Sequence, residues 1–251
     1  MIDGSVSLFG VTLTITAIYG ILSVLVLFLF MILWLMNRKK RTCQPIFAGQ
    51  VMNSVGFGLL PALAVLKAFQ HLGTGKGNVV IRPLPMVRWL SEEGYYLPMR
   101  IESAAAVLFF ILICLWLIIR KNDFPDNGDL ILIAVCIWAS IRLVTEEFRR
   151  YPQMLFHYTS SATILFCLAV WTIRRARMNR APLRTAADLT AVCLCLAVNI
   201  ITAKGILSAG SGIADFAVMT GSAALALLLT LIAGSDVRRL QEKRKTNDQP
   251  G

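Results

Sequence analysis

The most informative residues of this 251-residue chain are charged side chains that lie within or directly beside long apolar stretches. The densest group is the run Arg142-Leu-Val-Thr145-Glu146-Glu-Phe-Arg149-Arg150. A charge at the centre of a bilayer costs at least about 2.5–3.5 kcal/mol, so such a side chain is normally paired or lines a polar cavity. Spacings of four and three residues place Arg142, Glu146 and Arg149 on one stripe of a helix. On that helix Arg142 would lie about 10 Å deeper than Arg149.

This stripe has the composition of an anion site. A carboxylate between two arginines neutralises part of their charge and leaves one net positive charge. Because the planar guanidinium group matches phosphate oxygens bidentately, the stripe predicts a lipid-phosphate site formed by Arg142, Glu146 and Arg149. The alternative is an interface anchor in which these charges pair only with one another.

Further candidate residues lie near the ends of other apolar stretches. Arg100 and Glu102 form a second charged pair, which we expect at a similar depth and lining the same cavity. His71 and His157 are the only histidines, and each is a candidate proton acceptor, with a plain hydrogen-bonding role as the alternative. Lys67 is expected to snorkel toward the interface. Neither zinc-site spacing nor a phosphate-cradling glycine loop is present in the sequence, so we expect no metal and no cofactor.

The composition indicates which elements must position these residues. Hydrophobic residues make up 57% of the chain and charged residues 16%, against roughly 45–50% and about 25% in soluble domains. These values exclude a soluble globule, a disordered chain and a coiled coil. They predict an all-α, polytopic membrane protein forming a single integral membrane domain. The excess of basic residues occurs in short runs after apolar segments, which argues against a nucleic-acid partner.

Seven stretches are long enough to be expected as transmembrane helices. They comprise residues 8–36, 46–71, 101–119, 130–147, 156–173, 189–207 and 213–233. Glycines and Pro61 in the second stretch predict a kink or a break. Residues 72–100 are expected to form an outer interfacial segment or an ordered loop, and residues 241–251 a polar cytoplasmic tail.

Basic residues predict the orientation. Alternate connecting segments carry 16 of the 25 Lys and Arg residues, at 37–42, 120–121, 174–184 and in the tail from 236. The positive-inside rule therefore places the N-terminus outside and the C-terminus in the cytoplasm. No basic residue precedes the first stretch and no small-residue cleavage site follows it, so we do not expect a cleaved signal peptide.

Part of the chain resembles a known family. The motifs in order are Pro98-Met-Arg-Ile-Glu102, Arg120-Lys121 and Arg142-Leu-Val-Thr-Glu146-Glu-Phe-Arg149. Over residues 101–177 they resemble the C-terminal part of bacterial prolipoprotein diacylglyceryl transferases, in which a Pro-rich segment ends in a Glu and an Arg-Phe-x-x-Glu-Phe-x-Arg pattern follows. A weaker similarity covers residues 49–75. There His71 stands where the family's signature has an Arg, and the family's His-Gly-Gly segment has no counterpart.

The resemblance implies a multi-pass protein of the bacterial cytoplasmic membrane with an outward-open lipid cavity. Its expected ligand is phosphatidylglycerol, whose diacylglyceryl group the family transfers to the thiol of a lipobox cysteine on a secreted preprotein. Arg142, Glu146 and Arg149 would hold the phosphate and head group, Glu102 would orient them, and a histidine would have to replace the missing base. The second hypothesis is a non-catalytic subunit or scaffold that binds an anionic phospholipid or a signal peptide. A small transporter is less favoured, because no paired discontinuous helices occur in corresponding halves.

Overall fold

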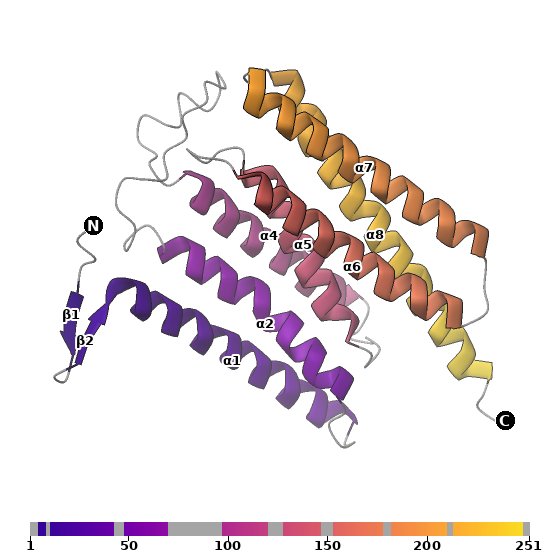
Figure 1. The fold of residues 1–251 in the computed structure, drawn as a ribbon. Coiled ribbons are helices and arrows are strands. Elements are labelled where there is room, and N and C mark those ends of the chain that lie inside the picture. Colours follow the sequence, from indigo (N-terminus) through magenta and orange to yellow (C-terminus); the bar gives the residue numbers. More distant parts are fainter. Residues whose placement is uncertain are drawn as a thin grey trace. The chain divides into compact units, whose positions relative to one another are not determined.

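Helices dominate the part of the chain that the computed structural model describes. These residues are 5–8, 11–42, 48–69, 97–119, 128–146, 153–177, 182–209 and 213–247. The helices within them are α1 (Ile15–Thr42), α2 (Ala48–Phe69), α4 (Leu97–Ile119), α5 (Asp129–Thr145), α6 (Met154–Arg177), α7 (Pro182–Ala209) and α8 (Ile213–Asn247) (Figure 1). All of them except α5 are long and apolar enough to cross a membrane. The prediction of a helical, multi-pass membrane protein is confirmed at this level.

A short hairpin precedes the first helix. Strand β1 (Ser5–Leu8) pairs antiparallel with β2 (Val11–Thr14), and α1 begins only at the next residue. The expectation of a helix from residue 8 was wrong by seven positions. The β-branched residues of β2 favour extended backbone, and the Thr14 hydroxyl accepts a hydrogen bond from the Ala17 amide at 3.2 Å, which caps α1.

The boundaries of the other helices also differ from the apolar stretches. Helix α4 starts four residues before the expected position, so residues 97–100 belong to a helix and the remainder of the expected loop lies outside the described residues. Helix α8 continues through residues 241–247 of the expected tail. Pro61 lies inside α2, which runs unbroken from Ala48 to Phe69. Of the two predicted effects of this proline and its neighbouring glycines, a kink or a break, the break is therefore wrong. Proline is tolerated in membrane helices when neighbouring groups satisfy the freed backbone.

The chain divides into two compact units, which are described separately. Unit 1 consists of residues 1–134 and 145–153, and unit 2 of residues 135–144 and 154–251. In unit 1, α2 packs against both α1 and α4 (Figure 1). The rings of Phe30, Phe57 and Phe110 join these three helices, with centroids 5.1–5.9 Å apart.

Two glycines bring helices of unit 1 unusually close. A Cβ on Gly58 would lie 2.7 Å from the Leu27 carbonyl oxygen of α1, and one on Gly56 would lie 2.3 Å from the Ile131 nitrogen of α5. Small residues permit such close backbone approach between membrane helices. Beside Gly56, the Asn53 side-chain oxygen accepts the Leu130 amide at 3.0 Å. Thus α2 satisfies one of the free amides at the start of α5.

In unit 2, α6, α7 and α8 pack on one another. The Asn199 side-chain amide of α7 donates to the Met219 carbonyl of α8 at 2.9 Å, so a polar group within the apolar span joins two helices. At the other contact, Gly234 of α8 leaves room for the fully buried Trp171 ring of α6, which a Cβ would meet at 2.8 Å.

Candidate functional site

A buried charge network joins three helices of unit 1. The Lys67 ammonium in the last turn of α2 lies 3.0 Å from the Glu102 Oε2 atom of α4, with side chains 8% and 0% exposed. The Thr145 hydroxyl, at the last residue of α5, donates to Glu102 Oε1 at 2.9 Å. One carboxylate is therefore contacted at both oxygens by groups from two other helices.

The order of the helices explains why these residues meet. Helix α4 follows α2 along the chain and runs antiparallel to it, so the end of α2 lies beside the start of α4. The Ser103 hydroxyl donates to the Ala64 carbonyl at 2.8 Å, which fixes this pairing next to Glu102. Helix α5 contacts α2 at Asn53 near its own start and reaches Glu102 at its end, so it runs parallel to α2.

This network corrects the expectation for Lys67. The side chain does not snorkel to the interface but is buried and paired with Glu102. The pairing could have been anticipated, because both charges fall at the facing ends of consecutive apolar stretches. The expectation for Glu102 as an orienting residue fits a carboxylate that holds two partners. Arg100, its expected partner, is exposed at the start of α4.

Glu146, which the sequence assigns to the phosphate site, makes a contact that the sequence did not predict. Its side chain is fully buried, and its Oε1 atom accepts the Gln153 backbone amide at 3.3 Å. Gln153 directly precedes the first residue of α6. A carboxylate at the amino end of a helix is stabilised by the free amides and the dipole there. Glu146, the residue after α5, is therefore hydrogen-bonded to the residue that precedes α6.

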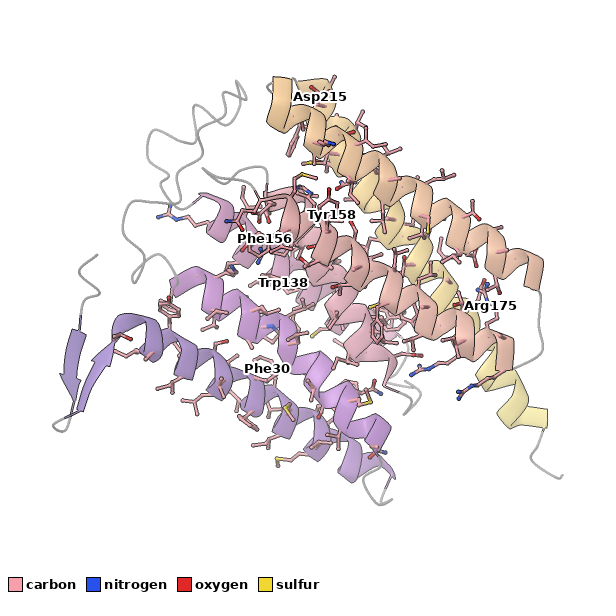
Figure 2. The ribbon with its side chains drawn as sticks, in the orientation of Figure 1. Phe30, Trp138, Phe156, Tyr158, Arg175 and Asp215 are labelled. Atoms are coloured by element: carbon pink, nitrogen blue, oxygen red, sulfur yellow. The ribbon has the colours of Figure 1, made fainter. Side chains whose placement is uncertain are left out.

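Arg142 and His157 belong to unit 2. The Arg142 guanidinium carbon lies 4.5 Å from the centroid of the Phe156 ring, at the start of α6 (Figure 2). This cation–π contact holds a half-buried guanidinium against an aromatic ring. His157, the next residue on α6, is fully buried. The remaining predicted residues, Arg149 and His71, lie outside the described residues.

A second buried charge network, which the sequence did not reveal, lies in unit 2. The Arg175 side chain is 3% exposed and contacts Asp188 at 2.6 Å, Asp236 at 3.6 Å and the Ala233 carbonyl at 3.4 Å. Figure 2 shows Arg175 on α6 near its final turn. Arg184 adds a second contact to Asp236 at 2.5 Å. The available signal was Asp188, the only acidic residue between positions 174 and 190.

Cysteines and acidic groups form no metal centre in the described part of the chain. No group of three or more His, Cys, Asp or Glu side chains is suitably arranged there. Cys136 and Cys167 are fully buried. Cys193, by contrast, is exposed on α7.

Each unit therefore holds one candidate for a binding site: the Lys67–Glu102–Thr145 network in unit 1, and the Arg142 side chain in unit 2. Removing charges from water is costly, and a buried ion pair is commonly no more stabilising than apolar residues of similar size. Ionisable residues within membrane helices are for this reason a default indication of function. Comparison of the chain with protein-family models, with curated proteins and with solved structures finds no match.

Proposed function

We propose that this protein binds an anionic phospholipid, phosphatidylglycerol, in a bacterial cytoplasmic membrane, as a divergent relative of the prolipoprotein diacylglyceryl transferases. The observation that carries the proposal is the buried Lys67–Glu102 pair, whose carboxylate also accepts the Thr145 hydroxyl. Apolar residues of similar size at these two positions would commonly give equal or greater stability, so the pair is not explained by stability alone. The residues around it are those over which the sequence resembles the family.

The binding chemistry is that of a phosphodiester. Arg142 offers a planar fork to the non-bridging phosphate oxygens, and its stacking on Phe156 holds the fork in one orientation. Glu102 orients neighbouring donors rather than touching the phosphate, since a carboxylate repels that anion. Glu146 is proposed to contact the head group, as the resemblance implies, and its Oε1 atom also accepts the Gln153 backbone amide.

If the protein is an enzyme, the reaction is transfer of the diacylglyceryl group to a cysteine thiol. The thiol sulfur attacks the glycerol carbon that bears the phosphate, a carbon–sulfur bond forms and the carbon–oxygen bond breaks. Glycerol phosphate leaves, and the thiol proton passes to a base. His157 is the candidate base within the described residues, and His71 is the other candidate.

A non-catalytic lipid-binding subunit is the second candidate function. It is favoured by one observation, the absence of any His-Gly-Gly segment from the sequence. Such a protein would keep Arg142 and the Lys67–Glu102 pair to hold a phospholipid or a signal peptide, without turnover.

We propose seven membrane crossings, with the N-terminus outside and the C-terminus in the cytoplasm. Helix α5 has 17 residues and is about 25 Å long, slightly less than the roughly 30 Å hydrocarbon core. Its interval from Leu130 to Thr145 covers about 22 Å, close to the roughly 21 Å from Asn53 to Lys67 of the longer α2. The contacts of α5 at these two levels support a crossing parallel to α2.

Reporter fusions test this topology. Reporters placed after residue 121 and after residue 152 are expected on opposite sides of the membrane, in the cytoplasm and outside respectively. Reporters on the same side would exclude a crossing by α5.

A transfer assay with the purified full-length protein tests the function. Labelled phosphatidylglycerol and a lipobox-cysteine peptide are supplied to the wild type, to Arg142→Ala and to Arg177→Ala, whose parent side chain is exposed at the far end of α6. Lipidation that is lost only in Arg142→Ala supports the enzyme. Phosphatidylglycerol retained on purification in an Arg142-dependent way, without lipidation, supports the binding subunit. Absence of both activities from the wild type would refute the proposal.

A further inference from the structure

Lys67 is a buried cation whose described partner is the Glu102 carboxylate, and the proposed function has not yet given it a contact with the ligand. Its helix α2 ends at Phe69, two residues later, and residues 48–69 form one of the apolar spans. The ends of apolar spans lie at the depth of lipid phosphates. An ammonium at this position is therefore placed where a phosphodiester is the prevailing anion.

The contacts of Lys67 suit a cation that serves a ligand. Lysine has three N–H donors on a flexible stem, so one can face Glu102 while another faces an incoming oxygen. Glu102 Oε1 is held by the Thr145 hydroxyl at 2.9 Å, so the carboxylate keeps its orientation if the ammonium turns. Glu102 thus provides a counter-charge whose orientation is held by Thr145 as well as by Lys67.

We propose that Lys67 is a phosphate ligand of this protein, and that Glu102 and Thr145 are positioning residues that hold its ammonium for the lipid phosphodiester. This inference rests on the proposed phospholipid binding and adds Lys67 to the residues that would carry it.

Two double variants separate binding from folding. Lys67→Met/Glu102→Leu replaces the pair with apolar residues of similar size, which is expected to leave thermal stability equal or higher. Lys67→Glu/Glu102→Lys keeps an ion pair but moves the ammonium to α4. A purely structural role predicts normal lipid binding by both variants, provided that they remain folded.

The measurement is binding of labelled phosphatidylglycerol to the full-length protein in nanodiscs of zwitterionic phosphatidylcholine. We expect both double variants to weaken binding by about tenfold to a hundredfold, as for one lost charge-assisted hydrogen bond. Lys67→Arg is expected to retain most of the binding. The matched control is Lys204→Met, which removes an exposed lysine near the end of α7 and should have no effect.

Each outcome decides one question. Wild-type protein that binds no phosphatidylglycerol overturns the proposed function itself. Wild-type binding that both folded double variants retain overturns only the role of Lys67. If unlabelled phosphatidylglycerol competes for binding but glycerol 3-phosphate and inorganic phosphate do not, the phosphate that binds belongs to a lipid. If glycerol 3-phosphate or inorganic phosphate competes and phosphatidylglycerol does not, the ligand is a free phosphate. Equal affinity for uncharged diacylglycerol would exclude a phosphate ligand at Lys67.

Discussion

Substituting Gly56 by alanine tests whether α5 is held tightly against α2. The added Cβ would lie 2.3 Å from the Ile131 nitrogen and 2.5 Å from the Leu130 carbonyl carbon, whereas ordinary contact begins at 3.4 Å. The overlap is roughly 1 Å, and rotamer changes cannot relieve it because the opposing atoms are backbone. The start of α5 must therefore move away from α2.

The cost of this movement has two parts. Overpacking of a close contact costs about 1–3 kcal/mol. A displacement of this size would also stretch the 3.0 Å bond between the Leu130 amide and Asn53, and losing that bond adds about 1 kcal/mol. We therefore expect Gly56→Ala to lower the free energy of unfolding by about 2–4 kcal/mol.

Gly20→Ala is the matched control, because nothing lies within 4 Å of a Cβ at that position of α1. Equilibrium unfolding of both variants by SDS titration in mixed micelles gives the two free energies. We expect Gly20→Ala to equal the wild type or exceed it, since alanine is the better helix former. Equal stability of the two variants would refute the close contact between α2 and α5.

Three further predictions concern unit 2 and use the same unfolding measurement. Arg175→Met should lower the free energy of unfolding by about 2–3 kcal/mol because it leaves the partly buried Asp188 carboxylate without the cation that contacts it at 2.6 Å. Arg177→Met, which removes an exposed side chain, should change stability little, and equal losses in the two variants would contradict the network. Asn199→Leu should lower the free energy of unfolding by about 0.6–2 kcal/mol, because it removes the hydrogen bond between α7 and α8. An unchanged or raised stability would show that this bond contributes nothing. Gly234→Ala should lower the free energy of unfolding by about 1–3 kcal/mol and alter the tryptophan fluorescence spectrum. Gly221→Ala is the control, because the position has open space around it, and it should change neither property. An unaltered spectrum for Gly234→Ala would argue against close contact with the indole ring.

The helices could be predicted from the sequence because apolar runs of about 20 residues have few alternatives in a bilayer. Their ends were less predictable. The hairpin at residues 5–14 lies at the start of an apolar run, so hydropathy alone cannot distinguish strand from helix there. Similarly, the polar first turns of α7 and last turns of α8 are helical although they fall outside the apolar stretches.

The candidate site was only partly predictable. The chain order placed Lys67 and Glu102 at facing helix ends, yet hydropathy could not distinguish a snorkelling lysine from a paired one. Glu146 was assigned to the phosphate because its spacing from Arg142 fits a helical stripe. Its hydrogen bond to the amide of Gln153, seven residues later in the chain, is a contact that helical periodicity does not encode.

The dependence of α5 on α2 has a consequence for biogenesis. Helix α5 is short, carries the fully buried Asp129 in its first turn and has Arg142 in its last. Charges within a segment make its partition from the translocon into lipid unfavourable. The surface that receives α5 is made by Asn53 and Gly56 of α2, which leave the ribosome more than 70 residues earlier. In the seven-crossing topology proposed above, helix α2 would therefore act as an internal template for the insertion of α5. Mutations at Asn53 or Gly56 should then leave α5 outside the bilayer during synthesis even where the finished protein tolerates them.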